Sequence, residues 1–225
     1  MHTMNTIYAE GTYNVRGIGS PEHPWLVRSA SLDGLTARGE MTLKARGVSL
    51  AIDLREPSER GPKSHTIPVR EIGLYQGELP GEGTLEGVYR DLIVNRGTRI
   101  TEAVVSVLEH PGVTVVQCTA GKDRTGLVVA ILRALLGDAR DEIVADYALS
   151  SAEVRTERAA AVARMITTLD LEGKSRAETE QLHLESPAWA IEDALDLVDE
   201  FGGPAAYLLR NGARVDQLPL VSGAA

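Results

Sequence analysis

The chain has 225 residues, 43% of them hydrophobic and 24% charged, which is typical of one globular domain spanning residues 1–225. A net charge of −9 argues against a nucleic-acid surface, and a single cysteine excludes an internal disulfide and zinc sites with several thiolates. The histidines have no metal-binding spacing and no apolar run could span a bilayer, so we expect no metal, no cofactor, no membrane insertion and a cytoplasmic location.

The first half of the chain alternates predicted helices and strands. Residues 35–46 have the spacing of a short amphipathic helix, and 47–55 form an apolar run that predicts a buried strand. Residues 100–108 again favour a helix. Residues 112–118, "GVTVVQC", predict a second buried strand after the Pro111-Gly112 turn.

The second half is predicted to be mainly helical. A buried helix runs from Thr125 to a stop at Gly137, and helical spacing recurs over 141–150, 152–170 and 188–201. Pro204 is suited to begin a last helix, whereas the polar stretch 172–187 predicts a mobile loop. This order of elements predicts an α/β domain with a central, mostly parallel sheet flanked by helices and a helical C-terminal third.

The stretch "QCTAGKDRTG", residues 117–126, lies between a predicted strand and a predicted helix. Such a turn directs backbone N–H groups toward one point at the positive end of the helix dipole, which suits a phosphate dianion. A Walker phosphate loop is excluded, because Val116 replaces its first glycine and Asp123 follows Lys122. The residues expected to bind the anion are Thr119, Ala120, Gly121, Lys122, Asp123 and Arg124.

The spacing C-x5-R, from Cys118 to Arg124, predicts nucleophilic chemistry on that anion. A thiolate of Cys118 would attack phosphorus and form a phosphocysteine, while the guanidinium of Arg124 would hold two phosphate oxygens in the transition state. The hydroxyl of Thr125 would donate to the sulfur. The structural alternative is that Cys118 is simply a small buried apolar residue.

These motifs resemble the cysteine-dependent protein tyrosine phosphatase family, and most closely its bacterial branch that includes the secreted mycobacterial tyrosine/lipid phosphatase. "TYNVRGIG" (12–19) is similar to an N-terminal Asn-Phe-Arg-Asp motif, and residues 25–59 to a segment ending in Asp-Leu-Arg-x-x-x-Glu. "CTAGKDRTG" (118–126) resembles the phosphate loop, "IVADYALS" (143–150) the region after it, and 201–213 the C-terminal segment. The resemblance implies a protein-tyrosine-phosphatase fold and a metal-independent phosphatase.

The sequence departs from the family pattern at three places. Gln117 replaces a histidine that orders the loop, and Gly17 replaces the last aspartate of the N-terminal motif. The resemblance leaves the general acid open. Aligning "TIPVREIGL" suggests Glu71, and Asp53 is the second candidate, although its favoured role is to brace Arg55 or the catalytic loop. Residues 78–91 are expected to form a short rim or lid.

The remaining expectations about the structure concern single residues. Lys122 and Asp123 are expected to point outward. Arg16 and Arg28 are expected either to reach the pocket or, as the favoured alternative, to pair with carboxylates such as Asp53 and Glu59. Trp25 and Trp189 are expected in the core, and His23, His65, His110 and His183 at the surface.

The leading hypothesis is a phosphomonoester phosphatase acting on a phosphorylated substrate: a phosphoprotein, a phosphoinositide, a small metabolite or a nucleotide. The alternative is a phosphatase-like module that binds a phosphorylated ligand with little turnover. A sulfurtransferase or arsenate reductase lacks support, since the chain has no second cysteine. No sequence feature predicts an oligomeric state.

Overall fold

A six-stranded sheet lies at the centre of the computed structural model, which describes residues 5–77 and 83–219. Its order is β1-β2-β3-β6-β4-β5, formed by Asn5–Thr6, Arg16–Gly19, Pro24–Ser29, Val113–Gln117, Val48–Asp53 and Val69–Glu71. The pairs β3–β6, β6–β4 and β4–β5 are parallel, whereas β1–β2 and β2–β3 are antiparallel. The carboxyl ends of β3, β6 and β4 therefore meet at one edge.

Neighbouring residues of the central strands face opposite sides of the sheet and join two separate cores. Val116 of β6 and Ile52 of β4 lie in the larger core, while the adjacent Val115 and Ala51 lie in the smaller one. This period of two follows from the pleat, and burial on both faces explains why these strands are apolar throughout.

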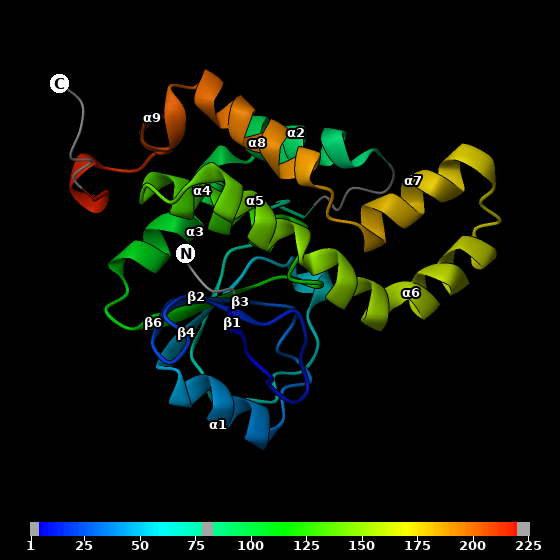
Figure 1. Cartoon of the computed structure of the whole chain (residues 1–225), viewed down its shortest axis with the longest axis horizontal. Helices are drawn as coiled ribbons and strands as arrows, with labels where there is room; N and C mark the ends of the chain where they lie inside the picture. The colour runs from blue at the N-terminus through cyan, green and yellow to red at the C-terminus, as the bar shows by residue number, and fades with distance from the viewer. Residues whose placement is uncertain (1–4, 78–82, 220–225) are drawn as a thin grey trace.

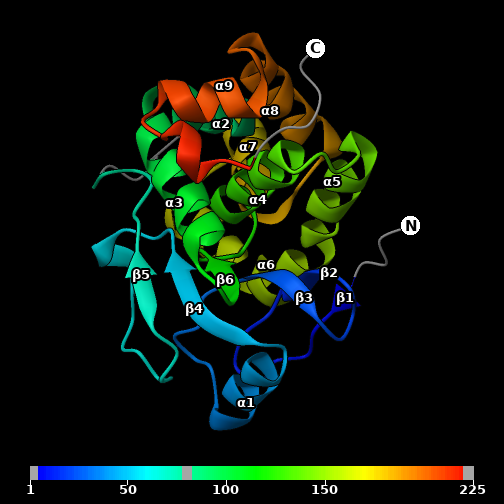
Figure 2. The same ribbon diagram turned by 90° about the vertical axis from the view of Figure 1, so that its left-hand side faces the viewer.

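Helices cover the two faces very unequally (Figures 1 and 2). Helix α1 (Ala37–Ala45) packs on the smaller core, while the helices that follow β5 lie on the opposite face of the sheet. All of these later helices except α6 contribute to the larger core, which has α4 at its centre. In chain order these are α2 (Leu85–Asn95), α3 (Gly97–Glu109), α4 (Asp123–Leu135), α5 (Arg140–Ala148), α6 (Ser150–Thr168), α7 (Gly173–Leu184), α8 (Ala188–Glu200) and α9 (Gly203–Arg210). Short 3-10 turns span Pro57–Glu59 and Val215–Gln217.

The predicted α/β class, with a mostly parallel sheet and a helical C-terminal third, is confirmed. The expected loop at 172–187 is wrong, because residues 173–184 form α7. This helix forms a hairpin with α6 that extends to one side of the molecule (Figure 1). Its apolar contact with α6 is a small cluster that includes Val162, Ile166 and Leu184.

Several smaller expectations also need correction. Residues 85–91 of the expected rim are the start of α2, while 78–82 lie outside the described residues. Trp25 and Trp189 are 37% and 39% exposed and do not anchor the core, whereas His65 is buried. No helix in the described ranges has the length and apolar character needed to cross a membrane.

Candidate active site

Residues 118–124 connect β6 to α4 and turn sharply at Gly121. This residue has a φ of +65°, and a Cβ at its position would lie 2.5 Å from the backbone of Ser29 at the end of β3. Only glycine combines this conformation with so close an approach. The turn leaves Cys118 buried at the start of the 118–124 loop and Arg124 in the first turn of α4.

The backbone carbonyls of the 118–124 loop are held on its outer side. The Nδ2 group of Asn14 donates to the carbonyls of Ala120 and Gly121 at 2.9 and 3.0 Å, and Arg28 donates to that of Gly121 at 2.8 Å. Within the described ranges, no backbone carbonyl accepts a hydrogen bond from the N–H groups of residues 119–122. A run of unpaired N–H groups before a helix is a binding site for an oxyanion.

A buried ion network fixes the side chains that hold these carbonyls. Arg16 donates to Asn14 Oδ1, and Arg16 and Arg28 contact opposite oxygens of Asp146 at 2.8 and 2.6 Å. Burial would raise the pKa of Asp146, but the charges of Arg28 and Arg16 outweigh it and hold the pKa well below its usual value. Asp146 of α5 thereby ties the N-terminal strands to the loop.

Glu59 holds the guanidinium of Arg124 in a bidentate ion pair, with both N–O distances at 2.6 Å. The Thr119 hydroxyl donates to the same carboxylate at 2.7 Å. Burial would raise the pKa of Glu59, but the hydrogen bonds and charge of Arg124 lower it to about 2. Glu59 thus stays ionised and orients Arg124.

The expected partners of Arg16 and Arg28 are wrong. Both arginines pair with Asp146, whereas Glu59 pairs with Arg124, and no ion pair in the described ranges joins Asp53 to Arg16 or Arg28. Sequence reasoning missed the role of Glu59, although the signal was present: Glu59 ends the Asp-Leu-Arg-x-x-x-Glu segment.

Gln117 lies in the position of the family histidine that orders the loop, and Thr125 is the expected donor to the Cys118 sulfur. The side-chain oxygen of Gln117 accepts a hydrogen bond from the Leu32 N–H at 2.6 Å, so it fixes the end of β6 to the chain that follows β3. Thr125 is fully buried, and its hydroxyl has no hydrogen-bond partner among the described residues. The expected bond from Thr125 to the Cys118 sulfur is therefore not formed.

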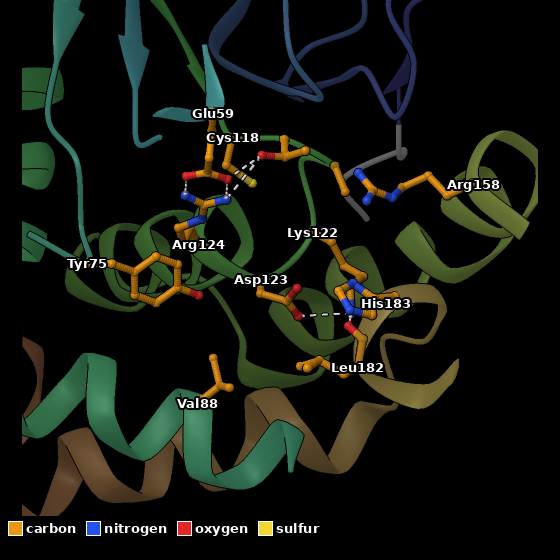
Figure 3. Close-up of a pocket in the computed structure, with 12 residues that line it drawn as sticks. Glu59, Tyr75, Val88, Cys118, Lys122, Asp123, Arg124, Arg158, Leu182 and His183 are labelled. Carbon is orange, nitrogen blue, oxygen red and sulfur yellow. Dashed lines mark hydrogen bonds and ion pairs between the residues drawn. The ribbon is translucent and has the colours of Figure 1, made fainter. Parts of the chain in front are cut away.

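A cavity of about 200 Å³ lies beside the 118–124 loop (Figure 3). Its floor is formed by Cys118 and the residues after it, and one wall by Tyr75 and Val88. The ring of Tyr75 packs against Arg124, with 4.9 Å from the guanidinium carbon to the ring centroid. Among the described residues, no group of His, Cys, Asp or Glu side chains is arranged to hold a metal ion.

Lys122 and Asp123 do not both point outward as expected. Lys122 is 1% exposed, and its ammonium donates to the carbonyls of Leu182 and Glu185 at the end of α7, at 2.8 and 2.6 Å. Asp123 contacts that ammonium at 3.0 Å, accepts a hydrogen bond from Tyr89 at 3.2 Å and lines the cavity. Lys122 therefore joins the loop to α7.

The two carboxylates expected as general acids lie elsewhere. Glu71, at the end of β5, has a side chain that is 59% exposed, pairs with Arg60 and lines a separate surface hollow. Asp53 is buried and accepts hydrogen bonds from the backbone and side chain of Arg55. Neither lines the cavity that contains Cys118, whereas Asp123 and Glu59 do.

Comparison with known proteins finds a matching family and several similar proteins. A family model described as "Tyrosine phosphatase family" matches residues 7–218. A tyrosine-protein phosphatase of Nostoc commune is 31% identical over 56% of this chain and 48% of its own length. The triple specificity protein phosphatase PtpB of Mycobacterium tuberculosis is 28% identical over 60% of this chain and 63% of its own.

A putative tyrosine-protein phosphatase of Cupriavidus necator is 28% identical over 77% of this chain and 68% of its own length. The matched region thus spans about half of the Nostoc relative and under two thirds of the mycobacterial one. Among solved structures, TpbA of P. aeruginosa has a TM-score of 0.42 and 15% identity, over 60% of this chain and 73% of that chain.

Proposed function

The chain belongs to the tyrosine phosphatase family, and from this premise we propose that it hydrolyses phosphomonoesters through a phosphocysteine on Cys118. The observation that carries the proposal is the unpaired run of backbone N–H groups at 119–122, beside the buried Cys118. Three phosphate oxygens bound by these groups would leave phosphorus above the sulfur.

In the first step, the Cys118 thiolate forms a bond to phosphorus while the bond from phosphorus to the leaving oxygen breaks. The N–H dipoles of the loop and the charge of Arg124 stabilise both the thiolate and the negative charge of the transition state. Because Glu59 keeps Arg124 oriented before substrate arrives, little reorganisation is needed when the charge develops.

We propose Asp123 as the group that protonates the leaving oxygen. It lines the cavity, and its partners are the Tyr89 hydroxyl and the Lys122 ammonium. Glu59 is a poor donor because Arg124 lowers its pKa to about 2. In the second step, Asp123 would take a proton from the water that attacks phosphorus, releasing inorganic phosphate and the Cys118 thiolate.

The substrate is proposed only at the level of a phosphomonoester. Relatives are named tyrosine-protein phosphatase and triple specificity protein phosphatase, and Tyr75 supplies an aromatic wall. Phosphoproteins, phosphoinositides and small phosphorylated metabolites are therefore all candidates. We propose a cytoplasmic location, because a reducing compartment protects a reactive thiolate from oxidation.

Replacing the nucleophile tests the mechanism. We expect Cys118→Ser to lower the turnover of p-nitrophenyl phosphate by at least about a thousandfold, while orthovanadate still raises the melting temperature of the variant. A Cys118→Ser protein with full activity would contradict the mechanism. A wild-type protein that binds vanadate but turns over no phosphomonoester would favour the binding-module alternative.

A further inference from the structure

The cavity wall formed by the α6–α7 hairpin carries Arg158, Leu182 and His183 (Figure 3). Arg158 extends from α6 toward the 118–124 loop, on the side of the cavity away from Tyr75. The two arginines that line the cavity, Arg124 and Arg158, thus come from different elements and approach it from different sides.

Arg158 differs from the other arginines around the site in lacking a carboxylate partner. Arg16 and Arg28 are paired with Asp146, Arg55 with Asp53, and Arg124 with Glu59. Over the described ranges, Arg158 forms no ion pair. Burial raises the pKa of the Tyr13 hydroxyl, and the charge of the nearby Arg158 works against this rise. The Nε of Arg158 is buried with no hydrogen-bond partner among the described residues.

A guanidinium without a carboxylate partner is suited to bind an anionic group of a ligand. A buried N–H group without an acceptor is unfavourable, and the rest of the planar guanidinium, which is partly exposed, matches the oxygens of a phosphate or carboxylate. The cavity has room for such a group, because about 200 Å³ far exceeds the roughly 10–15 Å³ that one water needs.

The neighbouring residues favour the same role for Arg158. Lys122 is committed to the carbonyls of Leu182 and Glu185, so it cannot serve a ligand without releasing α7. Burial, together with the charges of Arg158 and Lys122, lowers the pKa of His183. His183 is therefore neutral at pH 7, and its ring adds no charge but offers hydrogen bonds to a bound anion.

We propose that Arg158 binds a second anionic group of the substrate, so that the preferred substrates are small phosphomonoesters bearing a further phosphate or carboxylate. This inference rests on the proposed function, because the reacting phosphate occupies the 118–124 loop. A small molecule is favoured over an acidic macromolecule, since the chain has a net charge of −9 and would repel an extended anionic surface.

Binding to the Cys118→Ser protein tests the inference without requiring turnover. Calorimetry at fixed ionic strength would compare phenyl phosphate with 3-carboxyphenyl phosphate and 1,3-phenylene bisphosphate. We expect the second charged group to tighten binding at least fivefold. Arg158→Met, in the same background, should remove most of this gain, and Arg158→Lys, which keeps the charge but not the planar fork, should remove part of it.

Arg155→Met is the matched control, because Arg155 lies on the same helix, is exposed and pairs with Glu185 outside the cavity. It should retain the gain. If all three ligands bind equally, or if Arg158→Met keeps the full gain, the second-anion site is wrong while the proposed function stands. If no ligand binds, the phosphate site itself is wrong and both proposals fall.

A tyrosine-phosphorylated peptide with an acidic neighbouring residue distinguishes the source of the second anion. We expect a smaller dependence on Arg158 for this peptide than for the small bisphosphate. If Arg158→Met weakens binding of the peptide more than binding of the small bisphosphate, the assignment to small molecules is wrong.

Discussion

Glu59 stabilises the folded protein as well as orienting Arg124, because it supplies the counter-charge of a buried guanidinium. Its carboxylate accepts hydrogen bonds from both terminal nitrogens of Arg124 and from the Thr119 hydroxyl, and its side chain is largely buried. Removing its charge leaves a buried guanidinium without a partner, which is costly in a medium of low polarity.

We therefore expect Glu59→Gln to lower the free energy of unfolding at pH 7 by roughly 2–3 kcal/mol. The pKa of Glu59 falls from 4.5 to about 2 on folding. The contribution of Glu59 to the free energy of unfolding is thus fully present above pH 4.5 and is lost as the pH falls toward 2. The free energies of unfolding of the wild type and of Glu59→Gln should therefore converge over that interval. Urea denaturation across this pH range checks the expectation.

Glu71→Gln provides the control for this measurement. Glu71 forms an exposed ion pair with Arg60, and such pairs contribute about 0–1 kcal/mol. Equal losses from the two substitutions would contradict the role of Glu59.

At the residue scale, the sequence could predict those site residues that lie close together along the chain. Cys118, Gly121 and Arg124 lie within one loop, so C-x5-R brings them together without further information. The position of Glu71 could not be predicted, because it depends on where β5 ends relative to the cavity. The partner of Arg124, Glu59, is distant in sequence and is brought near only by the parallel pairing of β4 and β6.

At the element scale, α7 depends on contacts that the sequence does not reveal. Its composition is polar, and its internal support comes from exposed pairs such as Lys174–Glu178 and Arg176–Glu180. Each such pair stabilises a helix by only a few tenths of a kcal/mol. The end of α7 is held by the buried ammonium of Lys122, a contact across 60 residues that no helical spacing predicts.

We expect Lys122→Met to loosen α7. Without the ammonium, the carbonyls of Leu182 and Glu185 lose a charged donor. The apolar contacts that then hold α7 are the small cluster around Leu184 and the packing of Leu182 against the larger core. Hydrogen exchange should become at least about tenfold faster over residues 173–185, while β6 stays protected.

Lys174→Met is the control, since Lys174 lies on α7, is exposed and pairs with Glu178 alone among the described residues. If Lys122→Met leaves exchange in α7 unchanged, the contact does not hold the helix.

At the scale of the whole molecule, Asp146 joins the N-terminal strands to α5. Its carboxylate binds Arg16 of β2 and Arg28 of β3, and the backbone carbonyl of Asp146 accepts a further bond from Arg16. The strands that hold the 118–124 loop from outside are thereby attached to the C-terminal helices. Apolar patterning predicted the layers of this fold, but a buried charge cluster has no periodicity and could not be predicted.

We expect Asp146→Asn to lower the free energy of unfolding by about 3–5 kcal/mol, because two buried guanidinium groups lose their counter-charge. Phosphate binding should weaken as well, since Arg28 also holds the Gly121 carbonyl. The exposed Asp193→Asn on α8 should change stability by less than about 0.5 kcal/mol. Comparable losses from the two variants in chemical denaturation would contradict the network.

The central claim, that Cys118 becomes covalently phosphorylated during turnover, is tested most directly by trapping the intermediate. Wild-type protein would be mixed with an aryl phosphate, quenched in acid within milliseconds, digested and analysed by mass spectrometry. We expect one phosphoryl group on the sulfur of Cys118, and none in Cys118→Ser. Rapid release of the aryl group with no phosphate on Cys118, or with phosphate on another residue, would contradict the account.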